Sequence, residues 1–271
     1  MNTFLTIDVE EWFMVENLSN VINKENWSKY ESRVEKSVDK ILELLDRYNS
    51  KATFFILGWV AERNKSLIKK IVETGHEVAS HGYSHSILTS MSDDEIRNDV
   101  VKSKMILEDI SGCEIIGYRA PCFSITENAI EILKDSGYRY DSSFFPFSMH
   151  DRYGKISGIK VNSINEIENG FFEFPLTVRK IFNKEIPWSG GGYFRLYPLG
   201  IFNRGVRKII KEHNYFLLYL HPWEFDANQP KVKGLKLFNS FRHYNNLDKT
   251  EERFINLLKE FKFSRIKDCL K

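Results

Sequence analysis

The chain has 271 residues, of which 42% are hydrophobic and 28% are charged, and its formal net charge is +2. This composition predicts a sizeable core, and it argues against intrinsic disorder and against a nucleic-acid binder, which would carry a basic excess. Three cysteines without a CxxC pair make a disulfide framework unexpected and fit a reducing compartment.

The N-terminal stretch MNTFLTIDVEEWF has no basic region and no apolar run of signal-peptide length. No segment approaches the roughly 18 apolar residues of a membrane span. From these two features we expect a soluble, cytoplasmic protein without a membrane span.

Short apolar runs alternate with amphipathic stretches along the chain, beginning with a strand at 3–8 and a helix near 34–48. Ser66 and Ser92 are expected helix caps, and Ser92 forms a capping-box pattern with Glu95. The other predicted strands cover 52–57, 76–80, 114–120, 138–143, 171–176 and 215–221. The other predicted helices cover 66–75, 92–112, 126–137, 199–213 and 250–261.

Strands that alternate with helices predict a parallel sheet and an α/β fold. The seven predicted units favour a distorted TIM-like (β/α)7 barrel in a single domain, and a doubly wound open sheet is the alternative. In a barrel the C-terminal ends of the strands converge on one face, where active sites are built. Ionisable side chains stand at those predicted ends, namely Asp8, Glu10, His81, His85, Arg119, Asp141 and His221.

His81 and His85 supply two imidazoles in a loop of small residues, and a strand-end carboxylate would complete a three-ligand set for a catalytic metal. Asp8 and Glu10 lie two residues apart and share a face of their strand, so either can provide that carboxylate. His221 is either a satisfied core residue or a general acid. Arg119 needs a partner if it is buried, and Asp8 is the expected one.

The order of these motifs resembles that of the polysaccharide deacetylases of carbohydrate esterase family 4, the NodB-homology group. The resemblance covers residues 6 to 221 and rests on TIDVEEW, SHGYSH, YRAPCF, YDSSFF and LLYLH. The segments SGGGYFRLYP and FRHYNNLDKTEERF are similar to a branch found in exopolysaccharide gene clusters, with residues 228–271 as a C-terminal extension packed on the barrel.

The resemblance implies a role for each site residue and one divalent metal ion, with zinc favoured over cobalt, nickel, iron and manganese. Asp8 would be the catalytic base, oriented by Arg119, and His221 the general acid. Glu10 would bind the metal with His81 and His85, although the DxE spacing departs from the family pattern and leaves the choice between Asp8 and Glu10 open. Cys122 replaces the usual aromatic residue, and its backbone N–H would contribute to an oxyanion hole.

The implied activity is hydrolysis of the N-acetyl group of N-acetylhexosamine units in a poly- or oligosaccharide. The alternatives are an O-acetyl esterase, a hydrolase of small amides, and a carbohydrate-binding protein without catalysis. Asp141 is expected near the site. Residues 187–198 are expected to form a glycine-rich loop over it, and the aromatic residues expected to contact the sugar are Trp12, Trp188, Tyr193 and Trp223.

Overall fold

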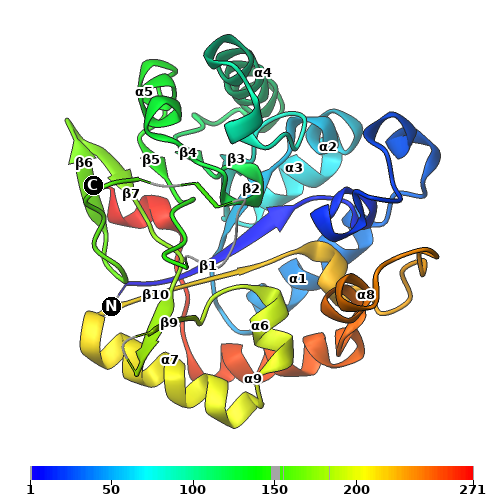
Figure 1. Cartoon of the computed structure of the whole chain (residues 1–271), viewed down its shortest axis with the longest axis vertical. Helices are drawn as coiled ribbons and strands as arrows, with labels where there is room; N and C mark the ends of the chain where they lie inside the picture. Colours follow the sequence, from blue (N-terminus) through cyan, green and yellow to red (C-terminus); the bar gives the residue numbers. More distant parts are fainter. Residues whose placement is uncertain (1, 148–152, 155, 183, 271) are drawn as a thin grey trace.

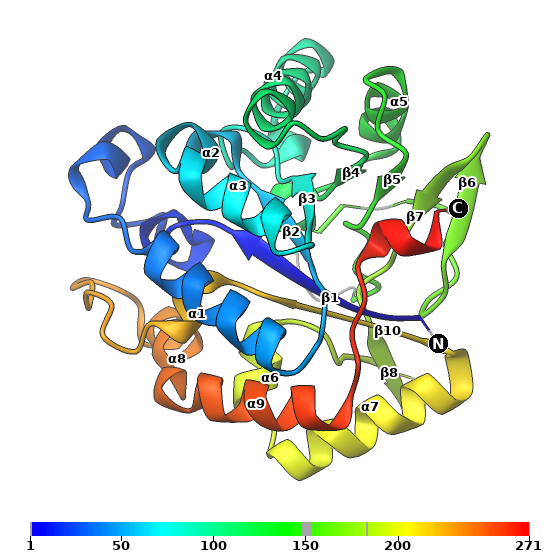
Figure 2. The same ribbon diagram turned by 180° about the vertical axis from the view of Figure 1, so that it is seen from behind.

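The computed structural model describes residues 2–147, 153–154, 156–182 and 184–270. Its centre is a curved sheet with the strand order β10-β1-β2-β3-β4-β5-β7-β6, and helices cover its outer face (Figures 1 and 2). Within the described residues, neighbouring strands from β10 to β7 are parallel, and β6 is antiparallel to β7. The strands of this sheet are β1 (Asn2–Val9), β2 (Thr53–Ile56), β3 (Glu77–Ser80), β4 (Gly117–Tyr118), β5 (Tyr140–Asp141), β6 (Asn165–Glu168), β7 (Phe171–Glu173) and β10 (Tyr215–Leu220).

The seven strands predicted from the sequence are confirmed as the parallel part of this sheet in the described chain. Their spatial order follows the chain from β1 to β5, without the reversal that defines a doubly wound sheet. A distorted (β/α)7 barrel is therefore confirmed. No strand ladder joins β10 to β7 among the described residues, but the Tyr215 hydroxyl donates to the Pro175 carbonyl at 2.6 Å across this seam.

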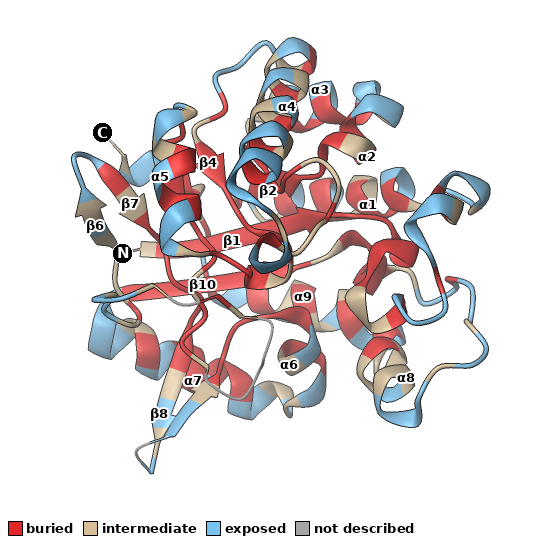
Figure 3. Cartoon of the chain, turned by 45° about the horizontal axis from the view of Figure 1, so that its top comes forward, coloured by how far each residue is buried: buried red, intermediate tan, exposed pale blue. Residues whose placement is uncertain are grey.

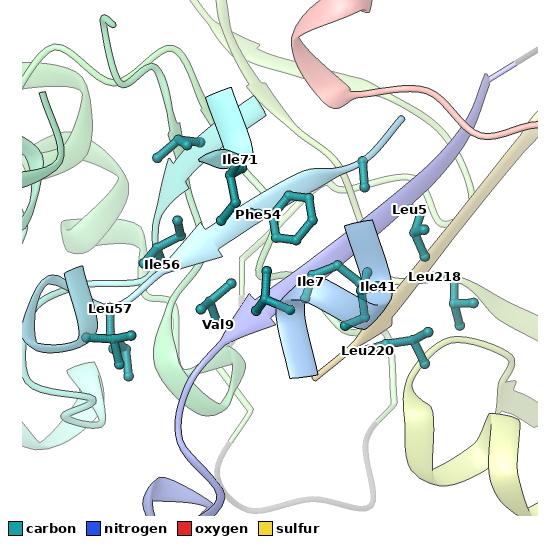
Figure 4. Packing of buried hydrophobic residues seen from close by; sticks show 14 of the residues in the cluster. Leu5, Ile7, Val9, Ile41, Phe54, Ile56, Leu57, Ile71, Leu218 and Leu220 are labelled. Carbon is teal, nitrogen blue, oxygen red and sulfur yellow. The ribbon is translucent and has the colours of Figure 1, made fainter. Parts of the chain in front are cut away.

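Alternate residues of β1 point to opposite sides of the sheet, as the two-residue period of a strand requires. Leu5, Ile7 and Val9 are fully buried and pack toward the surrounding helices (Figure 4). Phe4 points the other way, into a second cluster of strand residues that fills the barrel. Asp8 lies on this inner face, because it is four residues from Phe4, and the strand thus delivers its carboxylate to the C-terminal mouth of the barrel.

The predicted helices are confirmed near their predicted bounds, and the capping box of Ser92 and Glu95 is present. Two expectations were wrong. The helix predicted at 66–75 begins at Lys65, so Ser66 lies inside it and does not cap it, and the segment expected as a glycine-rich loop contains a helix, α6. The helices are α1 (Val34–Arg47), α2 (Gly58–Arg63), α3 (Lys65–Glu73), α4 (Asp93–Ser111), α5 (Glu127–Asp135), α6 (Gly191–Leu196), α7 (Leu199–His213), α8 (Leu237–Tyr244) and α9 (Thr250–Glu260).

Short 3₁₀ turns and one hairpin complete the architecture. The hairpin pairs β8 (Val178–Ile181) with β9 (Lys184–Pro187) outside the main sheet. The 3₁₀ turns are η1 (Trp12–Met14), η2 (Glu16–Leu18), η3 (Lys24–Lys29), η4 (Leu88–Ser90), η5 (Pro121–Phe123), η6 (Pro222–Phe225), η7 (Leu247–Lys249) and η8 (Ile266–Cys269). Buried residues occupy the central strands β1 to β5 and β10, whereas β6, β8 and the outer helix faces carry exposed residues (Figure 3). The described part of the chain contains no helix with the length and apolarity needed to span a bilayer.

Candidate active site

A cavity of about 120 Å³ lies at the C-terminal mouth of the barrel. Residues at or beyond the ends of β1, β3, β4 and β10 form its wall, together with residues of η2 and α8, so both halves of the chain contribute. The structure brings to this one cavity the predicted residues Asp8, Glu10, His81, His85, Cys122 and His221.

Glu10, His81 and His85 form a buried cluster in which one ligand atom from each residue lies within 4.8 Å of the others. Oε2 of Glu10 is 2.9 Å from Nε2 of His85, yet it accepts no hydrogen bond of acceptable geometry from any described residue. A buried carboxylate oxygen without a donor is costly, and a cation between the three side chains would satisfy it. Two imidazoles and a carboxylate are a donor set of catalytic zinc sites. These residues therefore fit a divalent metal ion.

Contacts outside the cluster fix both imidazoles. Nδ1 of His81 lies 2.8 Å from the carbonyl oxygen of Arg119, and donation of its proton leaves the lone pair of Nε2 available to a metal. Burial lowers the pKa of His81 to about 4, so the ring is neutral near pH 7. His85 has a left-handed backbone with φ of 52°, and its carbonyl accepts a hydrogen bond from Nζ of Lys24 at 3.1 Å. This uncommon conformation is held by the surrounding loop and directs His85 toward Glu10.

Asp8 pairs with Arg119 and does not join the cluster. Its Oδ1 lies 2.7 Å from Nη1 of Arg119, and both side chains are buried. The same nitrogen donates to Oγ1 of Thr6 at 2.7 Å, and Nε and Nη2 donate to the carbonyl and hydroxyl oxygens of Ser142 at 2.8 and 2.7 Å. A guanidinium held in this way fixes the position of the carboxylate that it binds. Of the two carboxylates left open by the sequence, the geometry favours Glu10 as the metal ligand.

His221 lies beside the cluster on the β10 side. Its Nε2 is 3.5 Å from Oε1 of Glu10, and its Nδ1 is 3.4 Å from Oε2 of Glu224. Burial opposes protonation of His221, but the hydrogen bond to Glu224 and the charges of Glu10, Glu224 and Asp8 together raise its pKa to about 9. Burial likewise opposes ionisation of Glu10, and the neighbouring His85, His221 and His81 outweigh it and lower the pKa of Glu10 to about 2. Without a bound metal ion, these shifts favour an ionised Glu10 beside a protonated His221.

Glu224 and Arg195 support His221 from behind, and the sequence reasoning missed both. Nε of Arg195 donates to Oε1 of Glu224 at 3.1 Å, and both side chains are almost fully buried. The other nitrogens of Arg195 donate to the carbonyl oxygens of Arg242, His243 and Asn245. The ion pair therefore joins the segment after β10, helix α6 and the end of α8. The sequence signal was the acid three residues after His221 in HPWEF, a spacing that a helical turn brings together.

Gly191 is required by the packing of α6 against Glu224. A Cβ atom at this position would lie 1.9 Å from each carboxylate oxygen of Glu224. A Cβ atom at the neighbouring Gly192 would meet no atom within 4 Å. The close approach of the α6 backbone to the Glu224 carboxylate thus requires glycine at position 191 and not at position 192.

Cys122 lies in a strained turn at the cavity wall. Its φ is 52° and that of Phe123 is 58°, which is uncommon for residues other than glycine and is often found at functional sites. The role of its backbone N–H in an oxyanion hole stays a prediction.

Asp141 is fully buried and lies behind this turn, outside the cavity lining. It accepts a hydrogen bond from Oγ of Ser143 at 2.7 Å, and that oxygen accepts one from the N–H of Ala120 at 2.7 Å, so Asp141 supports the turn and is not in contact with the cavity.

The aromatic residues predicted to contact a sugar occupy other positions. Trp12 and Trp188 are buried outside the cavity lining, and their indole N–H groups donate to the carbonyl oxygens of Glu31 and Phe202. Tyr193 lies on α6, in a neighbouring groove. Trp223 stacks on His221 with ring centroids 5.1 Å apart and donates to Oε1 of Glu10 at 3.1 Å. Trp223 therefore orients the candidate metal ligand, whereas Trp188 stacks on Phe202 of α7 with ring centroids 6.1 Å apart.

Several cavity residues were not predicted from the sequence. Tyr219 could have been found, because it lies two residues before His221 and hence on the same face of β10. The others were not singled out as site residues, although some of them follow the predicted residues Glu10 and Cys122 closely in the sequence. They are Glu16, Asn17, Phe123, Tyr153 and Arg242, together with Val15.

Comparison with known proteins matches the two halves of the chain to two different family models. Residues 23–140 match the family model described as polysaccharide deacetylase, and residues 142–271 match a domain of unknown function. The division predicted at residue 228 is not tested by these matches and stays a prediction. A peptidoglycan-N-acetylglucosamine deacetylase of Bacillus cereus is 39% identical over 92 residues, which is 34% of this chain and 34% of that protein. The chain thus spans about a third of the length of this relative.

Solved structures share the fold over nearly the whole chain. A Mycobacterium smegmatis protein assigned as a polysaccharide deacetylase superposes with a TM-score of 0.64 at 18% identity, covering 99% of this chain and 89% of that one. A carbohydrate esterase family 4 pseudoenzyme from Bacillus anthracis gives a TM-score of 0.53 at 19% identity, covering 100% of this chain and 65% of that one.

His81, His85 and Arg119 lie inside the matched segment, whereas Glu10 precedes it and His221 follows it. The resemblance predicted from the motifs is therefore confirmed for this segment, since residues 23–140 match the family model described as polysaccharide deacetylase.

Proposed function

We propose that the protein is a metal-dependent hydrolase that removes the acetyl group from N-acetylhexosamine units of a poly- or oligosaccharide. The observation that carries this proposal is the cluster of Glu10, His81 and His85 beside the Asp8–Arg119 pair, with His221 3.5 Å from Glu10. The Bacillus cereus relative supports the N-acetylated sugar. The resemblance of SGGGYFRLYP and FRHYNNLDKTEERF supports an exopolysaccharide or its precursor as the source of that sugar.

A divalent cation held by Glu10, His81 and His85, with zinc favoured by the donor set, supplies Lewis acidity and lowers the pKa of water. Asp8 accepts a proton from the attacking water, because Arg119 holds its carboxylate at the cavity. The N–H of Cys122 stabilises the developing oxyanion. His221 donates a proton to the departing amine, and Glu224 orients its ring through Nδ1. The products are acetate and a free amino sugar.

The function is tested by acetate release from N-acetylglucosamine oligomers and from O-acetylated xylo-oligosaccharides, with added zinc. We expect acetate and free amine in equal amounts from the first substrate, with loss of activity on chelation. Acetate from the second substrate alone would assign an O-acetyl esterase. If the zinc-bound protein released acetate from neither substrate but still bound to immobilised glycan, it would be a carbohydrate-binding protein.

Gly191→Ala is expected to lower kcat about 100-fold, because the new methyl group displaces Glu224 and with it His221. Bound zinc should not change, since none of the three ligands lies on α6. Steady-state kinetics and elemental analysis measure the two quantities. The matched control is Gly192→Ala, which meets no atom within 4 Å and should retain the kcat of the parent protein. Equal kcat in the two variants would contradict the positioning role of Glu224.

A further inference from the structure

The segment that ends in α8 carries apolar and basic side chains on one exposed surface. Leu237, Phe238 and Phe241 are 91%, 67% and 54% exposed. Val21 and Leu196, which are also exposed, lie near this segment. Together with the three residues above they make up five of the eight exposed large apolar side chains of the described residues. Figure 3 shows that α8 and the chain before it present exposed residues. Isolated exposed apolar residues are ordinary, but a contiguous group marks an interaction site.

The charge of this segment is one-sided. Residues 227–247 contain four basic residues and no aspartate or glutamate, although charged residues of both signs are balanced in the whole chain. Lys231, Lys233 and Lys236 are exposed, and no described carboxylate lies within 4 Å of their ammonium groups. The fourth basic residue is Arg242. The segment therefore presents a positive potential beside the apolar side chains.

A groove of about 410 Å³ borders this surface. Tyr193 and Leu196 of α6 line it opposite Phe238 and Phe241 of α8. Arg242 lines both the groove and the catalytic cavity. The groove and the catalytic cavity are therefore neighbours that share the side chain of Arg242.

We propose that α8 and the basic residues before it dock the protein on an anionic lipid membrane, with the catalytic cavity facing the bilayer. A helix with exposed Leu and Phe flanked by lysines has the composition of an interfacial helix, whose apolar side chains enter the headgroup region. The lysines add attraction to anionic lipids. An argument that rests on the proposed function disfavours the reaction product as the ligand: a deacetylated polymer carries ammonium groups, which the four basic residues would repel.

The test is co-sedimentation of the full chain with vesicles of phosphatidylcholine alone and of equal parts phosphatidylcholine and phosphatidylglycerol. We expect binding to the mixed vesicles that weakens as salt is raised, since exposed charges are screened. Phe238→Ser combined with Phe241→Ser should weaken binding roughly tenfold or more. Lys231→Gln, Lys233→Gln and Lys236→Gln together should remove the preference for anionic lipid.

The matched control is Met105→Ser, which removes an apolar side chain that is 65% exposed on α4, away from α8 (Figure 1). It should bind vesicles like the parent protein. The measurement needs no turnover, so its result is independent of the proposed activity. Absence of binding to the mixed vesicles, or equal binding by the Phe and Met variants, would overturn the proposal. Affinity electrophoresis in gels that contain a glycan gives the remaining outcome. If the glycan slowed the parent protein and the Met variant but not the Phe variant, the proposal would be overturned and the surface would be assigned to carbohydrate.

Discussion

His81→Ala is expected to abolish both zinc binding and acetate release. His81 is one of three buried ligands, and its Nδ1–H is already committed to the Arg119 carbonyl, so Nε2 is the atom that the substitution removes from the site. Removal of a residue that hydrogen-bonds to a metal ligand weakens metal binding by ~10- to 100-fold, and removal of the ligand itself should weaken it further. Elemental analysis and zinc titration by calorimetry measure the effect. The control His213→Ala removes an exposed histidine at the end of α7 and should retain zinc.

The same measurement decides between the two carboxylates. Glu10→Gln should lose zinc, whereas Asp8→Asn should keep zinc and lose turnover, because Asp8 is held by Arg119 at 2.7 Å. Breaking a buried ion pair costs about 3–5 kcal/mol, so the melting temperature of each variant must accompany the comparison. If Asp8→Asn lost zinc and Glu10→Gln retained it, the assignment made from the geometry would be reversed.

His221→Ala is expected to keep zinc and to lower kcat by about 10²- to 10⁴-fold, the usual contribution of a general acid. Its imidazole touches Glu10 but is not one of the three clustered ligands. Trp223 also donates to Glu10 and remains in the variant, so the candidate ligand keeps one of its supports. Zinc content and steady-state kinetics on N-acetylglucosamine oligomers are the measurements.

A substrate with a good leaving group separates acid catalysis from a general loss of structure. Nitrophenolate departs without protonation, so 4-nitrophenyl acetate should be hydrolysed by His221→Ala with a much smaller loss than the amide. Equal losses on the two substrates would contradict a proton donor. A parallel fall in zinc content would make His221 a metal ligand.

The positions of the strands and of most helices could be predicted because their signals are local. Apolar residues at two-residue and three-to-four-residue spacings predict burial on one face, and glycines mark the ends of helices. The parallel order then places the ends of β1, β3, β4 and β10 on one side, which is why Asp8, His81, Arg119 and His221 could be expected together. The helix α6 was missed because the three consecutive glycines 190–192 resemble a loop; the packing of Gly191 against Glu224 and of Gly190 against Tyr219 accounts for two of them.

The sequence by itself determined the barrel, the strand-end residues and the spacing of His81 and His85, because hydrophobic periodicity is a property of neighbouring residues and the alternation of strands with helices predicts a parallel order. The tertiary structure alone decided that Glu10 contacts His85 while Asp8 contacts Arg119. The two carboxylates lie close together in the sequence, but their partners come from other parts of the chain. The tertiary structure also decided that Arg195 and Glu224 support His221 and that Arg242 reaches the cavity. These contacts join segments up to 213 residues apart, as Glu10 and Trp223 are, and burial of charge fixes them only when the chain is folded.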